Sequence, residues 1–145
     1  MTFKTFTLSA LVASTLIAAA PAFAGHGNTA NVTQNGLFNN VAGGQAGNGN
    51  LLELYQMGFG NDIFAVQDGS DNVTAIGQSG VNNSANSSQT GAWNLNAVAQ
   101  IGNDNTANVE TNGFGNSNAV IQIGDGNSAS TSVNGFGNSS LIVQY

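Results

Sequence analysis

Asparagine and glutamine recur in this sequence at a fixed spacing, and their carboxamide groups are the chemistry that the pattern offers. From Asn28 onward every eleventh residue is Asn, and the seventh residue of nearly every such unit is Gln. A carboxamide both donates and accepts hydrogen bonds, so stacked amides can form a ladder that leaves few of them unpaired. The predicted assembly ladder consists of Asn28, Asn39, Asn50, Asn61, Asn72, Asn83, Asn94, Asn105, Asn116, Asn127, Asn138, Gln34, Gln45, Gln56, Gln67, Gln78, Gln89, Gln100, Gln122 and Gln144.

A glycine stands two residues after the seventh position in each of the first ten units, so the repeat reads Asn-x-Φ-x-Φ-x-Gln-x-Gly-x-x, where Φ is mostly apolar. Thr111 and Val133 take the place of Gln in two units. Glycine adopts positive φ without steric cost, which suits a position where the chain reverses. The predicted corner residues are Gly36, Gly47, Gly58, Gly69, Gly80, Gly91, Gly102, Gly113, Gly124 and Gly135.

Side chains suited to catalysis or metal binding are scarce. His26 is the only histidine, there is no cysteine, and the acids fall at corners or at outward positions. We therefore predict a protein that is not an enzyme, with no catalytic, cofactor or metal site. The acids are interpreted as solvated charges that limit premature aggregation. They are Glu53, Asp62, Asp68, Asp71, Asp104, Glu110 and Asp125.

The charge of the chain excludes anionic partners. The net charge is −6 and Lys4 is the only basic residue. Without Lys or Arg a protein cannot neutralise phosphates or grip an anionic membrane surface. We therefore expect neither nucleic acid nor membrane insertion.

The N-terminal segment has the features of a secretory signal peptide. Lys4 precedes an apolar run from Leu8 to Ala20, and Ala22 and Ala24 fit cleavage after residue 24. The run is shorter than the roughly 20 apolar residues that span a bilayer. We predict a cleaved signal at 1–24, a short segment at 25–27 and a repeat domain of eleven units at 28–145, located outside the cytoplasm.

Within a unit the recurring Asn, apolar and Gln residues occupy positions 1, 3, 5 and 7. This spacing of two predicts a strand over the first seven residues with one buried face, followed by a corner at Gln-x-Gly-x-x. The fifth position alternates between bulky and small residues with a period of 22. We therefore predict an all-β, two-sheet β-solenoid with two strands per coil and no visible cap. The fifth position of one strand should face the third of the next, as for Ile76 and Ala85.

The aromatic residues are predicted to be exposed. Tyr55 and Phe64 should point outward from strands, where they could bind matrix or dyes or pack between filaments. The remaining outward positions vary freely, which disfavours a regular binding face of the adhesin or ice-binding type. The aromatic corner residues are Phe38, Phe59, Trp93, Phe114 and Phe136.

The repeat resembles that of the curlins, the subunits of the curli amyloid fibres of Gram-negative bacteria. The curlin pattern, Ser-x5-Gln-x-Gly-x-x-Asn-x-Ala-x3-Gln, is matched within residues 72–89 and again within 94–107. The terminal residues 135–138 and 144–145 also look like the end of a curlin. The matching residues of the first stretch are Gln78, Gly80, Asn83, Ala85 and Gln89.

The resemblance implies a secreted subunit that assembles with itself into an extracellular amyloid fimbrium for adhesion, aggregation and biofilm matrix. It also implies a nucleator curlin, an outer-membrane curli secretion channel and periplasmic chaperones as partners. Two departures stand out: coils begin with Asn instead of Ser, and only residues 25–27 precede the first unit, where the major curlin has an export segment. Basic C-terminal residues, which are typical of minor nucleating curlins, are absent. The pattern favours the major type over the nucleator and over a non-polymerising solenoid.

Overall fold

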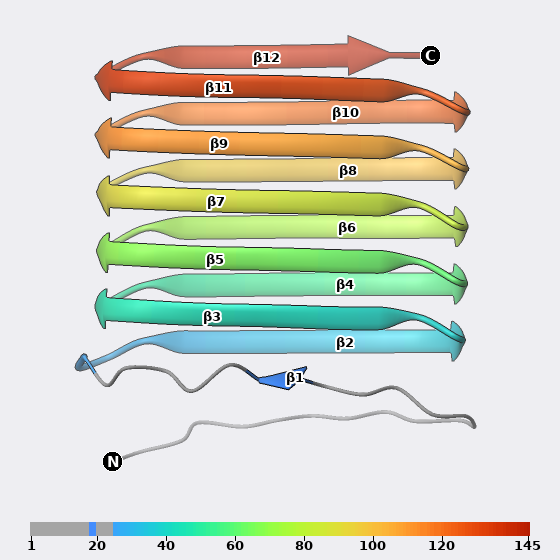
Figure 1. Ribbon diagram of the computed structural model, residues 1–145, viewed down its shortest axis with the longest axis horizontal. Coiled ribbons are helices and arrows are strands. Elements are labelled where there is room, and N and C mark those ends of the chain that lie inside the picture. The colour runs from blue at the N-terminus through green and yellow to red at the C-terminus, as the bar shows by residue number, and fades with distance from the viewer. Residues whose placement is uncertain (1–17, 20–24) are drawn as a thin grey trace.

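The computed structural model describes residues 18–19 and 25–145, and these form a two-sheet β-solenoid without a helix (Figure 1). The chain passes alternately between two sheets, so each coil contributes one strand to each of them. The fold class expected from the sequence is confirmed. The predicted signal at 1–24 lies outside the described residues, apart from the short strand β1 (Ala18–Ala19).

Each sheet takes every second strand of the chain. One sheet, called sheet A below, contains β1 and then β3 (Asn40–Asn48), β5 (Asp62–Ser70), β7 (Ser84–Ala92), β9 (Thr106–Phe114) and β11 (Ser128–Phe136). The other, sheet B, contains β2 (Thr29–Leu37), β4 (Leu51–Phe59), β6 (Val73–Val81), β8 (Leu95–Asn103), β10 (Ser117–Asp125) and β12 (Ser139–Gln144).

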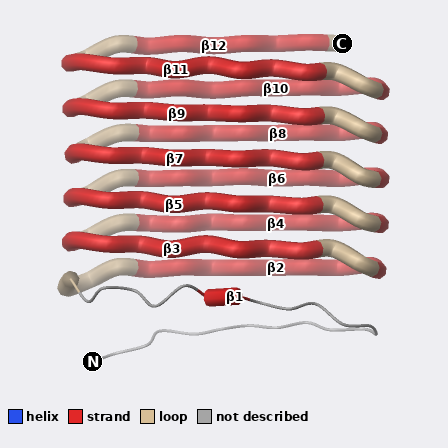
Figure 2. The backbone as a smooth tube through the Cα atoms, in the orientation of Figure 1, coloured by secondary structure: helices blue, strands red, loops and turns tan. Residues whose placement is uncertain are grey.

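Neighbouring strands in a sheet are parallel and their register is constant. In sheet B, Val98 pairs with Val120 and Gln100 with Gln122, a separation of 22 residues that holds from β2 to β12. The turns obey the same register, since the amide of Leu51 donates to the carbonyl of Asn72 at 2.8 Å. Strands and turns therefore stack directly on one another along the whole solenoid (Figure 2).

The strands are longer than the sequence predicted. Strand β6, for example, covers Val73–Val81 and continues through Gly80, so the predicted corner at Gln-x-Gly-x-x is wrong in its limits. The actual turn is narrower and includes Asn82, which has a φ of 54°. The difference arises because Gly80 pairs with Gly58 and with Gly102 in the neighbouring coils, so the ladder of backbone hydrogen bonds passes through the bend.

The odd positions of each unit face the interior, as predicted. The predicted opposition of positions five and three is confirmed by Ser87 and Asn96, whose side chains are hydrogen-bonded across the core at 2.9 Å. At one such site the side chain of Leu52 fills the space opposite Gly43, where a Cβ would lie 2.9 Å from Leu52 Cδ2. The apolar core comprises Val41, Leu52, Leu54, Ile63, Ala65, Ile76, Ala85, Val98, Ala107, Val109, Val120 and Ala129.

No helix among the described residues is long and apolar enough to cross a membrane.

Two glycines of the same strand give a matched test of the stacking. Gly80 has a φ of +128°, and a Cβ there would overlap the carbonyl oxygen of Gly102, whereas Gly77 has no atom within 4 Å of the corresponding Cβ position. We expect Gly80→Ala to lower the free energy of unfolding by at least about 1–3 kcal/mol through backbone strain. Gly77→Ala should leave it unchanged or raise it slightly. Urea unfolding followed by circular dichroism measures both, and equal losses would contradict the proposed close approach.

Candidate functional site

A continuous ladder of glutamine side chains runs along the inner face of sheet B. In each step the Nε2 group donates to the Oε1 atom of the glutamine one coil further on, at 2.7–2.9 Å. The four central members are at most 1% exposed. The ladder consists of Gln34, Gln56, Gln78, Gln100, Gln122 and Gln144.

From Gln56 onward, the second amide hydrogen of each glutamine donates to a backbone carbonyl across the core. Nε2 of Gln56 donates to the carbonyl of Asn40 at 3.0 Å, and Nε2 of Gln78 donates to the carbonyl of Asp62 at 3.0 Å. These carbonyls belong to the facing sheet, so the glutamines join the two sheets as well as successive coils. Both amide hydrogens thus have partners, which offsets the cost of burying the group.

The ladder in sheet A is shorter. Gln45, Gln67 and Gln89 are linked at 2.9 and 2.8 Å, and Thr111 and Val133 occupy the next two positions. The Oε1 atom of Gln89 also accepts a hydrogen bond from the hydroxyl of Thr74 at 2.8 Å. The predicted row of like amides therefore ends after three members in this sheet.

Beyond Gln89 a polar network crosses the core in place of the ladder. The hydroxyl of Thr111 donates to Oδ1 of Asn96 at 2.6 Å, and Nδ2 of Asn96 donates to Oγ of Ser87 at 2.9 Å and to the carbonyl of Ser88 at 3.2 Å. The 11-residue repeat does not predict this network. The network could have been found from Asn96 and Ser87, which are polar residues at the third and fifth positions, where most units have apolar residues.

Two rows of asparagine form the turns, one at each end of the strands. The backbone amide and Nδ2 of Asn72 both donate to Oδ1 of Asn50, at 3.0 and 3.1 Å. Nδ2 of Asn72 also donates to the carbonyl of Gly91 at 2.9 Å. The rows are Asn28, Asn50, Asn72, Asn94, Asn116 and Asn138 at one end and Asn39, Asn61, Asn83, Asn105 and Asn127 at the other.

The repeat glycines make these asparagine contacts possible. All ten have a φ between +94° and +130°. The carbonyl of Gly102 accepts the hydrogen bond from Nδ2 of Asn83 at 2.8 Å, and it is the atom that a Cβ at Gly80 would overlap. A side chain at the glycine position would therefore break both the backbone stacking and the asparagine row.

The ladders end differently at the two ends of the described solenoid. At the first coil, Oε1 of Gln34 is buried and has no hydrogen-bond partner among the described residues. At the last coil, Nε2 of Gln144 donates to the carbonyl of Ser128 at 3.0 Å, and its ladder hydrogen has no acceptor in the described chain. One end thus presents an amide acceptor and the other an amide donor.

The acids lie on the outer surface, where neighbouring amides bind several of them. Nδ2 of Asn40 donates to Oδ1 of Asp62 at 2.8 Å, and Nδ2 of Asn103 donates to Oδ1 of Asp125 at 2.9 Å. The described residues contain no group of three or more acidic or histidine side chains that could hold a metal ion.

The aromatic residues named in the sequence analysis are exposed. Two pairs stack between coils at the turns: Phe38 lies edge-on to Phe59 with ring centroids 5.1 Å apart, and Phe114 is parallel to Phe136 at 5.3 Å. Trp93 is 62% exposed. Stacking of aromatic rings adds to the contact between coils at these turns.

Comparison of the sequence with protein-family models and with curated proteins finds no match.

The polar network and a neighbouring asparagine give a second matched test. Asn96 has partners for both ends of its amide. Oδ1 of Asn118, one coil away, is buried without a partner in the described part of the chain, and its Nδ2 makes one long contact of 3.5 Å. We expect Asn96→Ala to lower the free energy of unfolding by about 1–3 kcal/mol, because Thr111 and Ser87 lose their partner. Asn118→Ala should cost clearly less. Denaturant titration of the two variants tests the order, and the reverse order would contradict the network.

Proposed function

We propose that the protein is a secreted structural subunit that assembles with itself into extracellular, curli-like amyloid fibres on a Gram-negative bacterium. In this role it contributes to surface adhesion, cell aggregation and biofilm matrix and performs no catalysis. The observation that carries the proposal is the complementary termination of the ladders. The partners that the curlin resemblance implies, namely a nucleator, a secretion channel and chaperones, belong to the same proposal.

The backbone supports assembly at both ends. Strand β2 is an outermost strand of sheet B at one end, and β11 and β12 are the outermost strands at the other. On their outer sides they pair with no strand among the described residues. Such edges present rows of amide and carbonyl groups that template the addition of another strand. A second copy offers edges with the same spacing.

The side chains make this addition directional. Oε1 of Gln34 is an acceptor without a partner among the described residues, and Nε2 of Gln144 is a donor at the other end of the same ladder. Head-to-tail stacking brings donor-bearing and acceptor-bearing ends of different copies together. A head-to-tail contact that does not close into a ring generates a filament. A structural fibre is therefore the function that this arrangement supports best.

Fibre formation is the first test. Purified residues 25–145 should form fibres whose diffraction shows a reflection near 4.8 Å along the fibre axis, the spacing of stacked parallel strands. Fragments of these fibres, added as seeds, should shorten the lag before soluble protein assembles, because each fragment presents both edges. A protein that stays monomeric in sedimentation experiments at high concentration, with or without seeds, would refute the proposal.

The second test compares inward and outward substitutions. Replacing Gln56, Gln78 and Gln100 together with Ala leaves neighbouring buried amides unpaired, at about 1–3 kcal/mol for each group, and should lengthen the lag time. Replacing Asp62, Asp71 and Asp104 with Asn keeps acceptor oxygens and removes charge, so it should shorten the lag time.

Dye-binding kinetics at constant protein concentration measure both lag times. Shifts in the same direction, or no shift in either set, would contradict the assignment of the glutamines to assembly.

A further inference from the structure

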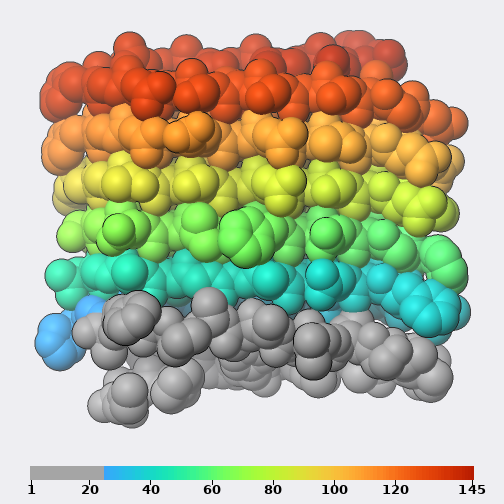
Figure 3. Space-filling model, in the orientation of Figure 1, coloured from blue at the N-terminus to red at the C-terminus, as the bar shows by residue number. Residues whose placement is uncertain are grey.

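The two outer faces of the solenoid differ in chemistry. On sheet B the outward side chains from β4 to β12 are mostly aliphatic or alanine, and the exposed acids of these strands are Glu53 on β4 and Asp125 at the end of β10. On sheet A, whose outer face Figure 3 shows as stacked rows of side chains, serine, threonine and asparagine dominate, with Asp62, Asp68 and Glu110 among them. The outward positions are therefore sorted by sheet, and the prediction from the sequence that they vary freely is wrong.

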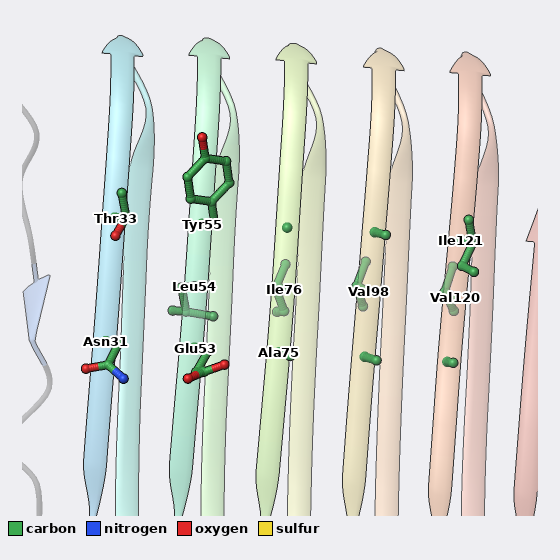
Figure 4. A pocket seen from close by; sticks show the side chains of 14 residues that line it. Asn31, Thr33, Glu53, Leu54, Tyr55, Ala75, Ile76, Val98, Val120 and Ile121 are labelled. Carbon is green, nitrogen blue, oxygen red and sulfur yellow. The ribbon is translucent and has the colours of Figure 1, made fainter.

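The middle of the sheet B face is hollowed. Small residues, Ala75, Gly77, Ala97 and Ala99, floor an open trough of about 560 Å³. Figure 4 shows this region, with Glu53 and Tyr55 on β4 and Ile121 on β10, on either side of β6 and β8, whose outward side chains that line the trough are short.

Large apolar side chains border the trough along the strands. Leu95 and Ile101 lie at opposite ends of β8 and are 40% and 54% exposed, and Ile123 of β10 is 40% exposed. The face therefore has apolar ridges beside an apolar hollow. Stacked sheets pack about 10 Å apart, a distance at which ridges of one sheet can enter a hollow in the other.

The size of this face suits a specific contact. The strands from β4 to β10 are roughly 27 Å long and the five strands from β4 to β12 are roughly 19 Å wide, which gives a face of roughly 500 Å². Two such faces bury roughly 1,000 Å² in total, which is at the lower limit for a specific protein interface. In a fibre the contact repeats with every subunit, so a weak contact for each copy is enough to hold two filaments together.

The distribution of charge indicates which surface can cover the outer face of sheet B. Residues 25–145 contain no Lys or Arg, so an acid of one copy has no cation on another copy with which to pair. Two sheet A faces would bring like charges together, whereas the central strands β6 and β8 of sheet B carry no acid and can approach a second such face without repulsion.

We propose that the outer face of sheet B is a lateral interface that packs against the same face of a second filament of this chain. This inference rests on the proposed function, because it concerns how the proposed filaments associate. The trough of each filament receives apolar ridge residues of the other, and the acidic face of sheet A remains in water. The natural fibre is then a pair of solenoids and not a single one.

The experiment is a measurement of fibre mass per unit length by dark-field electron microscopy. Wild-type fibres of residues 25–145 should have twice the mass per length of a single stacked solenoid. Ala97→Asp places a carboxylate in the trough and should reduce the value twofold, to single filaments. Ala97→Ser, which keeps the trough small and uncharged, should retain paired filaments.

The matched control is Asn108→Asp. Asn108 lies on the outer face of sheet A, where its Oδ1 accepts a hydrogen bond from Nδ2 of Asn86 at 2.9 Å, and aspartate keeps that acceptor. This variant has the same net charge as Ala97→Asp but should leave the fibres paired.

Three results would overturn the inference: single wild-type filaments, equal effects of Ala97→Asp and Asn108→Asp, or single filaments that bind neutral lipid vesicles through this face. In each of these cases a 4.8 Å reflection would show that the proposed fibre itself survives. Absence of that reflection in wild-type protein would refute both proposals.

Discussion

The constant register of the parallel backbone hydrogen bonds is the constraint on which the rest of the structure depends. Because each residue pairs with the one 22 positions away, every side chain meets its counterpart in the next coil at the spacing of neighbouring strands. Aliphatic side chains tolerate such stacking, and carboxamides benefit from it, since one amide donates to the next. Buried carboxylates one above another would repel, and no acid lies among the buried residues. The composition of the interior, aliphatic and amide with few other groups, follows from the register.

The turns show how two residue types depend on each other. Asn83 reaches the carbonyl of Gly102 because no side chain intervenes at Gly80, and Gly80 keeps its positive φ because the coils stack closely there. Glycine alone would leave a loose bend, since it loses more conformational freedom on folding than other residues. The asparagine restores order by joining its backbone and its side chain to the preceding coil. Asn and Gly therefore recur together in the repeat for one reason: each residue needs the other for the turn to form.

The sequence was sufficient to predict the two sheets, the 22-residue coil and the inward glutamines, because each of these is periodic and every coil repeats the same signal. It failed where the structure departs from the repeat. The bond between Asn96 and Thr111 joins residues that break the pattern in different ways, and only the facing of the two sheets brings them together. The strand limits failed because glycine signals a bend, whereas pairing between coils continues through Gly80. The difference between the outer faces was present in the sequence but is lost when outward positions are averaged over a period of 11 instead of 22.

The two surfaces proposed for assembly differ in the kind of selectivity they provide. At the ends, backbone edges and the Gln34 acceptor require a partner with matching spacing, because a strand without the amide would leave a buried group unpaired at about 1–3 kcal/mol. Hydrophobic contact across the face of sheet B is not directional, and its strength depends on the apolar area that is buried. Axial growth would therefore select copies of the same repeat, whereas lateral pairing would depend on shape and on the absence of charge. A substitution on the outer face can alter the thickness of the proposed fibre without disturbing the register that builds each filament, because outward side chains take no part in the amide ladders.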